Sequence, residues 1–328
     1  MKKLKVVLIG TGGRASDVVF PSLNDIDNVE IVGICDIDQQ RMQRIADLYK
    51  IDKRYGAQGI LDYQNMVNDL KPDAAVVVGQ PHIMYDIWMW CLEQKLHLLI
   101  EKPLGLSIHQ ARALEAVAAR NNVVTQVTFQ RRYSPMVTQM REECLKRGPI
   151  THALCRFYKY DPRDSLGMRD HMMDDCVHSI DTLRWMCNSE VVKVESKTNR
   201  FGTVDINFIS AVLHFENGAT GHLINSWTSG KRIFAIEMHA NGIFAEAEHE
   251  IGGMVYTDGS LEGKEYTAAG AADSDAFYVK TGVLAAVRDF TDCCINGGQP
   301  MSCFSDAVKT MKVAEIILAQ SLLAEPLG

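Results

Sequence analysis

A short segment in the second half of the chain places three polar side chains at helical spacing. Asp174, His178 and Asp181 lie four and three residues apart, so on one helix they project from the same face. A neighbouring carboxylate orients an imidazole and raises its basicity, and removal of a hydride from an alcohol requires such a base near neutral pH. The competing interpretation is an N-capping Asp174 and a histidine with a purely structural role. The segment therefore indicates acid/base chemistry only in combination with other residues.

Lys102 is the residue in the first half of the chain that completes such a combination. It follows the apolar run Leu96–Ile100 and Glu101, at the C-terminal end of an expected parallel strand. Ligands of open α/β sheets bind at that end of the strands. Pro103 restricts the backbone of Lys102 and so helps to aim its side chain.

A glycine-rich turn near the N-terminus predicts a dinucleotide site. It fits the pattern G-x-G-x-x-G/A directly after the first strand and consists of Gly10, Thr11, Gly12, Gly13, Arg14 and Ala15. The glycines permit a tight turn and close approach of a pyrophosphate, which the helix N-terminus attracts. Asp36, at the end of the second strand, is placed to accept the adenosine ribose hydroxyls. The alternative is a simple turn followed by a helix that Asp36 caps.

Asp36 also favours NAD over NADP. Its carboxylate accepts two ribose hydroxyls and repels a 2′-phosphate, and residues 37–39 supply no cation to bind one. Arg41 is the residue that could reach the phosphate from the following helix.

The elements that must position these residues differ between the two parts of the chain. Over residues 1–123, short apolar runs alternate with amphipathic segments that begin after Asp38 and Ser107. This part predicts an α/β N-terminal Rossmann domain with a doubly wound parallel sheet. Its expected strands are Leu4–Ile9, Val29–Cys35, Ala74–Val78, Leu96–Ile100 and Val123–Phe129, the last of which crosses into the second part.

Residues 124–328 read as an α+β C-terminal domain with a large, mostly antiparallel open sheet for substrate binding and oligomerisation. Longer alternating segments appear, and Asn-Gly breaks at 217–218 and 241–242 predict hairpins between them. Helical patterns near 174–187, 281–295 and 304–323 would cover one face of the sheet.

Composition excludes several other classes of function. The net charge of −7 and the lack of a dense basic tract argue against a nucleic-acid partner, and no apolar run is long enough to span a membrane. Nine scattered cysteines, an odd number in a long chain, favour a reducing cytoplasm. No C-x-x-C, H-x-x-x-H or H-E-x-x-H pattern occurs, so no metal site is expected.

These motifs together resemble the Gfo/Idh/MocA oxidoreductases, the family of glucose-fructose oxidoreductase and inositol dehydrogenase. The resemblance extends over nearly the whole chain and rests on the glycine turn, Phe20-Pro21, Cys35-Asp36, Glu101-Lys102-Pro103, Phe129–Pro135 and Asp174-x-x-x-His178-x-x-Asp181. It implies that Lys102, Asp174 and His178 are catalytic, the lysine polarising the reacting oxygen and the histidine exchanging the proton. It also implies a cis Lys102-Pro103 bond and a homodimer or homotetramer formed through the open sheet face.

The sequence departs from the family pattern around the expected nicotinamide. Gly79-Gln80-Pro81 replaces a usual Thr-Pro-Asn, Met84 stands in place of a common histidine, and Cys176 replaces a small residue beside His178. His82, two residues away, is a possible substitute for that histidine or simply a helix-start residue. We expect Gly79, Gln80, Pro81, Glu101 and Lys102 to contact the cofactor. Candidate substrate residues are Arg131, Arg132, His171 and Asp181, with solvated arginines as the competing interpretation.

The expected function is an NAD-dependent dehydrogenase or reductase that acts on a secondary CH-OH group of a sugar, sugar derivative or cyclitol. For catalysis, Lys102 and His178 must face a common cleft although more than seventy residues separate them. Two alternatives remain open at this stage: an NAD-dependent glycosidase of the same fold, and a non-catalytic NAD-binding sensor. The substrate's identity does not follow from the sequence.

Overall fold

A computed structural model of the chain describes residues 3–162 and 171–324. The chain forms two compact units, each built from two segments. The first unit contains Met1–Thr128 and Val283–Val308, and the second contains Phe129–Gly282 and Lys309–Gly328.

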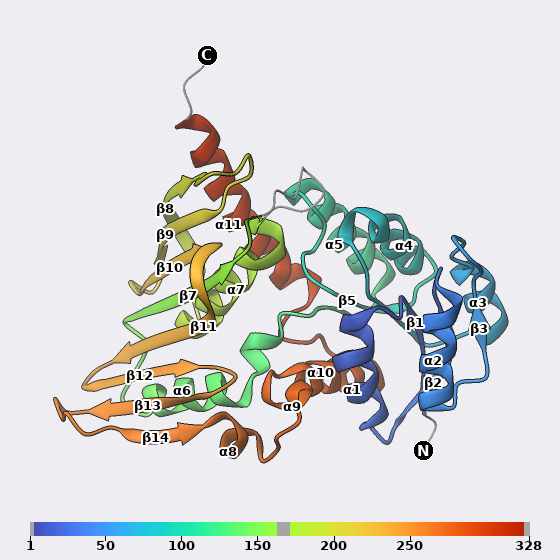
Figure 1. Cartoon of the computed structure of the whole chain (residues 1–328), viewed down its shortest axis with the longest axis horizontal. Coiled ribbons are helices and arrows are strands. Elements are labelled where there is room, and N and C mark those ends of the chain that lie inside the picture. Colours follow the sequence, from blue (N-terminus) through green and yellow to red (C-terminus); the bar gives the residue numbers. More distant parts are fainter. Residues whose placement is uncertain (1–2, 163–170, 325–328) are drawn as a thin grey trace. The chain divides into compact units, whose positions relative to one another are not determined.

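The core of the first unit is a six-stranded parallel sheet in the order β3-β2-β1-β4-β5-β6 (Figure 1). This is the strand order of a dinucleotide-binding fold, so the predicted doubly wound sheet is confirmed. β1 and β4 are buried on both faces, which explains their unbroken apolar sequences. The strands are β1 Leu4–Ile9, β2 Val29–Cys35, β3 Arg54–Tyr55, β4 Ala74–Val77, β5 His97–Ile100 and β6 Thr125–Val127.

Helices cover both faces of this sheet, and two of their starts were predicted. The side chains of Asp38 and Ser107 cap α2 and α5 by accepting hydrogen bonds from the backbone N–H groups of Arg41 and Gln110. α10 comes from the distant second segment and packs against α1 and η1. The helices are η1 Ala15–Val19, α1 Phe20–Asn24, α2 Gln39–Tyr49, α3 Tyr63–Leu70, α4 Pro81–Glu93, α5 Ile108–Asn121 and α10 Val283–Asn296.

The second unit contains an eight-stranded sheet in the order β14-β13-β12-β11-β7-β10-β9-β8. Among the described strands of this sheet, only β7 and β10 pair in parallel, so the predicted mostly antiparallel sheet is confirmed. Both predicted hairpins form, with Gly218 and Gly242 at positive φ in their turns. The strands are β7 His152–Tyr160, β8 Val191–Asn199, β9 Phe208–Phe215, β10 Thr220–Ser226, β11 Thr228–Ala240, β12 Ile243–Glu248, β13 Gly252–Thr257 and β14 Lys264–Thr267.

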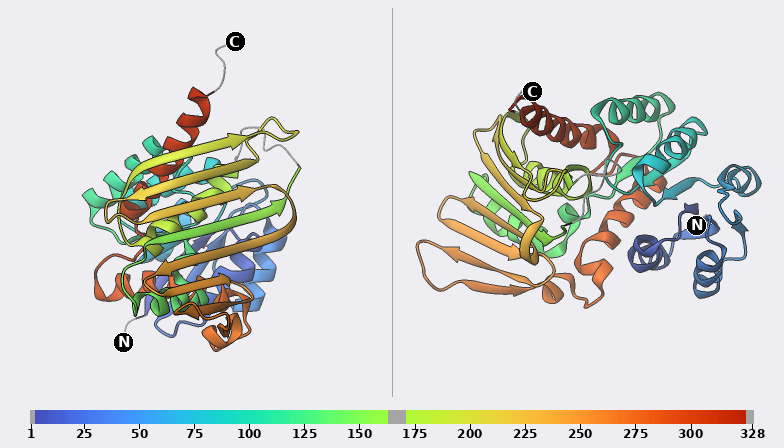
Figure 2. Two further views of the ribbon diagram at one scale, coloured as in Figure 1. Left: turned by 90° about the vertical axis from the view of Figure 1, so that its left-hand side faces the viewer. Right: turned by 45° about the horizontal axis from the view of Figure 1, so that its top comes forward.

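One face of this sheet is covered by α6 and α7, whereas Figure 2 shows the other face without a covering helix. We call the first the covered face and the second the open face. The helices of this unit are η2 Gln130–Tyr133, α6 Pro135–Leu145, η3 Met172–Cys176, α7 Val177–Cys187, α8 Ala268–Ala272 and α9 Phe277–Lys280, and α11 Phe304–Leu323 enters it from the first unit. Among the described residues, no helix has both the length and the apolar character needed to cross a membrane.

The segment that carries Asp174 and His178 differs from the single α-helix that their spacing suggests. Met172–Cys176 is a π-helical turn, and the regular α-helix begins only at Val177. Because a π turn closes over five residues rather than four, the four-residue spacing no longer stacks the two side chains as a regular helix would. π turns are frequent at functional sites, so the irregular turn makes this segment a candidate for such a site.

Candidate functional site

The glycine turn of the first unit has the geometry that its sequence predicts. Gly10 has φ +96°, and a Cβ atom there would lie 1.9 Å from the Val78 carbonyl oxygen, so no other residue fits. At Gly12 and Gly13 the nearest atoms to such a Cβ are side-chain ends, at 3.7 Å and 3.9 Å. The turn therefore packs tightly against the end of β4 at Gly10, whereas Gly12 and Gly13 have only the ends of the Arg41 and Asp17 side chains as their nearest neighbours.

Asp36 is held at the mouth of this turn. Its Oδ2 atom accepts hydrogen bonds from the Thr11 backbone N–H (2.5 Å) and hydroxyl (2.7 Å), and its Oδ1 atom accepts one from the Asp38 N–H (2.8 Å). The side chain is almost completely buried. A carboxylate has about four acceptor positions, so these bonds fix its orientation and leave acceptor capacity for a ribose hydroxyl.

Arg41 lies beside the same turn. Its Nη2 atom is 3.1 Å from an Asp38 carboxylate oxygen, and its Nη1 atom is the one closest to the built Cβ of Gly12. The cation that could reach a 2′-phosphate is thus close to the turn, partly neutralised by Asp38.

The other predicted cofactor residues follow β4 and β5. Gln80 and Pro81 begin α4, with His82 exposed in its first turn, and a Cβ on Gly79 would collide with the Met84 side chain at 2.3 Å. The carboxyl ends of parallel strands share one edge of a sheet, so these residues, the glycine turn and Asp36 belong to the same edge.

The Lys102 loop is joined to the glycine turn by an ion pair. Glu101 is buried and accepts a hydrogen bond from Arg14 Nε at 2.9 Å, which links the loop after β5 to the turn after β1. Lys102 is partly buried, and the Lys102-Pro103 peptide bond is cis, as the resemblance implied.

In the second unit, His178 and Asp174 lie at the junction of η3 and α7. His178 is buried, and its ring packs edge-on against Phe129 with 6.0 Å between ring centroids. Asp174 is half-buried in the π turn.

Arg132 and Asp181 form a buried, bidentate ion pair. Arg132 donates from Nε at 2.9 Å and from Nη2, and Thr310 of α11 adds a hydrogen bond of 3.2 Å to the same carboxylate. Both side chains of the pair are at most 4% exposed. Asp181 therefore connects α7 to η2 and α11.

A further carboxylate, Asp175, was not among the sequence-predicted residues. It accepts a hydrogen bond from the Trp227 indole N–H at 2.9 Å and forms an ion pair with Lys159. His171 stacks on the same indole with 4.3 Å between centroids, and burial lowers the pKa of His171. The adjacent pair Asp174-Asp175 was the available signal, but spacing alone does not show which of two consecutive carboxylates faces the sheet.

Arg131 is also buried, but it is not paired in the way that Arg132 is. Its guanidinium carbon lies 3.7 Å from the ring centroid of Phe234 and 4.6 Å from that of Phe157, above the covered face of the sheet. Its Nε and Nη1 atoms have no hydrogen-bond partner among the described residues. Desolvation lowers the pKa of Arg131 to about 10, so it remains charged at neutral pH.

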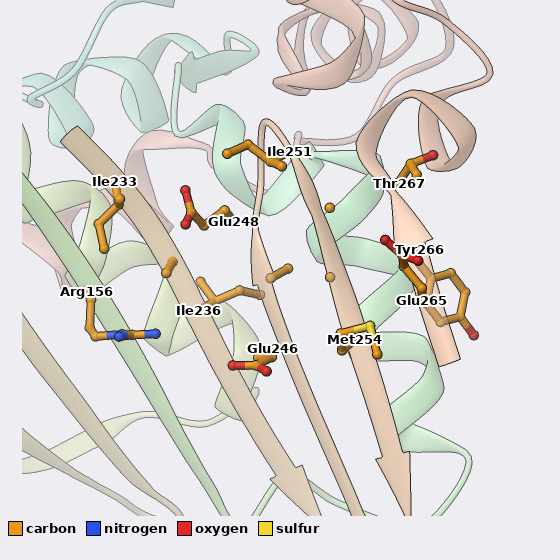
Figure 3. Close-up of a pocket in the computed structure, with 14 residues that line it drawn as sticks. Arg156, Ile233, Ile236, Glu246, Glu248, Ile251, Met254, Glu265, Tyr266 and Thr267 are labelled. Atoms are coloured by element: carbon orange, nitrogen blue, oxygen red, sulfur yellow. The ribbon is translucent and has the colours of Figure 1, made fainter. Parts of the chain in front are cut away.

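None of the predicted site residues lines the groove on the open face shown in Figure 3. Its walls come from β7 and from β11 to β14 and include Arg156, Glu246, Glu248, Met254 and Tyr266. Within residues 3–162 and 171–324, no group of three His, Cys, Asp or Glu side chains is arranged to hold a metal ion.

Comparisons with known proteins agree with this fold. One family model, described as an oxidoreductase family with an NAD-binding Rossmann fold, matches residues 4–129, and a second, the GFO/IDH/MocA C-terminal domain, matches residues 147–242. Inositol 2-dehydrogenase of Salmonella typhimurium is 25% identical over 196 residues, which is 58% of this chain and 57% of that protein. The match thus spans little more than half of that relative.

Two further similarities cover almost the whole chain. The putative oxidoreductase YceM of Salmonella typhimurium is 23% identical over 328 residues, 97% of this chain and 98% of that protein. The solved structure of a levoglucosan dehydrogenase with NADH and levoglucosan superposes with a TM-score of 0.84 at 16% identity, covering 99% of this chain and 98% of that one. At such identity, the structural likeness establishes the fold alone.

Proposed function

Since the chain belongs to the Gfo/Idh/MocA oxidoreductase family, with an NAD-binding Rossmann fold, we propose that it transfers a hydride to or from a secondary alcohol carbon of a sugar, sugar derivative or cyclitol. The observation that carries the proposal is the edge of the first unit, where the glycine turn, buried Asp36 and the Lys102 loop are joined by direct hydrogen bonds. An edge built in this way suits a dinucleotide and a reacting oxygen together.

The residues present fit NAD. No backbone atom crowds Gly12 or Gly13, which would face a pyrophosphate, and Asp36 is pre-oriented toward ribose hydroxyls by Thr11 and Asp38. We propose NAD rather than NADP, because a 2′-phosphate would approach the carboxylate of Asp36. When bound, the nicotinamide would accept or supply the hydride.

The chain's own residues would handle the proton and the charge on oxygen. We propose that His178 takes up or returns the proton, that Asp174 orients it, and that Lys102 stabilises negative charge on the reacting oxygen. Burial of His178 against Phe129 limits its rotation, which suits a base with a fixed target. The pair of Arg132 and Asp181 would act indirectly, by holding α7 and its histidine against η2 and α11.

The test is a panel of inositols, aldoses, anhydrosugars and sugar acids incubated with NAD while nicotinamide absorbance is recorded. Lys102→Ala and His178→Ala should each lower kcat by roughly 10²-fold or more, the usual effect of removing one preorganised group, with a much smaller change in NAD affinity. The exposed Lys53 supplies a control, since Lys53→Ala should leave both quantities unchanged.

Near-normal turnover by the Lys102 variant would show that this lysine is structural. Tight NAD binding without oxidation of any panel member would favour a sensor. Release of an aglycone from aryl glycosides without net NADH would favour the glycosidase alternative.

We also propose that copies of the chain associate through the open face of the eight-stranded sheet. Four rings from β7, β11, β12 and β13 stack in a row on that face, namely those of His152, His239, Phe244 and Tyr256. Their successive centroids are 3.9, 4.7 and 5.6 Å apart. A continuous, flat ring surface of this kind is typical of association sites, where aromatic side chains are enriched.

A further inference from the structure

Arg131 is a buried cation that forms no direct ion pair with a carboxylate among the residues that the structure describes. Its side chain is only 4% exposed, and its guanidinium lies against the rings of Phe157 and Phe234. Desolvating an unpaired charge costs several kcal/mol, of which a cation–π contact returns about 2. The unliganded fold therefore leaves this charge incompletely compensated.

The acidic residues that influence Arg131 are engaged elsewhere. Asp175 forms an ion pair with Lys159 and accepts a hydrogen bond from Trp227. Glu250 forms an ion pair with Arg232, with 3.4 Å between Oε1 and Nη1. The neighbouring His249 supplies no negative charge, and burial, then repulsion by Arg131, lower its pKa to about 3 and keep it neutral.

A second buried polar group lies next to Phe157 in the sheet. Asn225 of β10 is fully buried on the covered face, and neither its amide nitrogen nor its amide oxygen has a hydrogen-bond partner among the described residues. Its Cα pairs in register with that of Phe157, one of the two rings beneath the Arg131 guanidinium. An unsatisfied buried amide costs about 1–3 kcal/mol, so the fold carries two incompletely compensated polar groups next to Phe157.

We propose that Arg131 and Asn225 together bind a carboxylate group of the substrate, so that the substrate is a sugar acid such as a uronate or an aldonate. This inference rests on the proposed function and specifies its substrate class. A carboxylate accepts two parallel bonds from a guanidinium, and the amide N–H of Asn225 can donate to it from the side. The amide oxygen then remains to accept a substrate hydroxyl.

The charge balance selects a carboxylate over a phosphate. One guanidinium neutralises a monoanion, whereas a phosphate ester would bring up to two negative charges close to Asp175. A neutral polyol would satisfy the hydrogen bonds of Asn225 but would leave the charge of Arg131 without a counter-ion.

The experiment compares matched probes. D-Glucuronate is paired with D-glucose, D-galacturonate with D-galactose, D-gluconate with D-glucitol, and glucose 6-phosphate and myo-inositol complete the set. Two readouts are used: NADH formation, and calorimetric binding of each probe to the NAD-loaded protein. We expect at least one acid to exceed its neutral counterpart by roughly 10- to 100-fold in kcat/KM or affinity, the range for a charge-assisted hydrogen-bonded pair.

Variants attribute that preference to the two residues. Arg131→Met removes the charge at similar length and should abolish the preference for the acid, whereas Arg131→Lys should retain part of it. Asn225→Asp should weaken binding of the acid by like-charge repulsion. Arg147→Met is the matched control, because Arg147 pairs with Asp258 on the surface of the same unit. Urea unfolding of Arg131→Met checks its integrity, and we expect it to be no less stable than the wild type without ligand.

The outcomes separate this inference from the proposed function. Oxidation of neutral polyols or of glucose 6-phosphate in preference to every acid would overturn the inference and leave the dehydrogenase intact. An unchanged preference for the acid in Arg131→Met would also overturn it. Binding of an acid that depends on Arg131, without any NADH formation, would support the carboxylate site and contradict the proposed reaction.

Discussion

Replacement of His249 should alter how the stability of the chain depends on pH. His249 is completely buried, and desolvation, with repulsion from Arg131 as the next cause, lowers its pKa from 6.5 to about 3. As the pH falls through 6.5, His249 binds a proton in the unfolded chain, whereas in the folded chain it stays neutral down to about pH 3. Acid therefore lowers the unfolding free energy, and His249 causes no such loss of stability above pH 6.5.

The size of the effect follows from that difference in pKa. At pH 5.0 the unfolded histidine is 1.5 pH units below its pKa, which corresponds to about 2 kcal/mol at 1.36 kcal/mol per unit. His249→Gln removes the titrating group and retains a donor for the Phe234 carbonyl group. Its unfolding free energy should therefore fall by about 2 kcal/mol less than that of the wild type between pH 8.0 and pH 5.0.

The measurement is urea unfolding at pH 8.0, 6.5 and 5.0, followed by tryptophan fluorescence, with the difference taken between variant and wild type. The other histidines contribute equally to the pH dependence of both proteins, so their contributions cancel in the difference. His109→Gln, at an exposed position, should parallel the wild type. Arg131→Met should weaken the dependence of the unfolding free energy on pH, because loss of the cation raises the pKa of His249. Between pH 8.0 and pH 5.0, the unfolding free energies of His249→Gln and of the wild type could instead fall by the same amount, to within about 0.5 kcal/mol. His249 would then not be held neutral in the folded chain, and our account of its surroundings would be wrong.

Two other predictions concern the cofactor and the assembly. NAD should bind at least several-fold more tightly than NADP, and Asp36→Ala should narrow that difference, because it removes the carboxylate that repels the 2′-phosphate and leaves Arg41 in place. Calorimetric titration with both nucleotides measures the two affinities, and a preference of the wild type for NADP would refute the prediction. Sedimentation should show that the wild type is a homodimer or homotetramer. Phe244→Asp and Tyr256→Asp should each dissociate it, since each substitution places a charge in the row of stacked rings on the open face. Unchanged assembly of both variants would mean that the interface lies elsewhere.

Much of the first unit could be predicted from the sequence because its signals are local. Strand runs such as Leu4–Ile9, the caps Asp38 and Ser107 and the constraint on Gly10 each depend on a few consecutive residues. The sharing of one edge by the glycine turn and Lys102 then follows from parallel pairing. The return of α10 to this unit was not foreseen, because a helix's own amphipathic pattern does not state which sheet it covers.

In the second unit, several features of the site could not be predicted from short sequence patterns. The π turn at Met172–Cys176 was missed because one additional residue in a helical turn hardly changes the apolar pattern. The bidentate pair of Arg132 and Asp181 joins residues 49 positions apart, and no spacing rule distinguishes Arg132 from Arg131 beforehand. Asn225 did leave a signal, since it follows Gly221 and Leu223 at an inward position where alternation calls for an apolar side chain.

The contrast between the two adjacent arginines shows which buried charges serve folding and which require a ligand. Arg132 meets a carboxylate on α7 with two bonds and ties three elements together, so its charge is compensated whether or not substrate is present. Arg131 lies equally deep but meets two aromatic rings, and Asp175, an acid whose charge acts on it, is already paired with a lysine. A stable unliganded fold gains nothing from a charge in that position, since an apolar side chain of similar volume would avoid its desolvation. The free energy that compensates Arg131 must then come from outside the fold, and an anionic group on the substrate is the source that the charges around it permit.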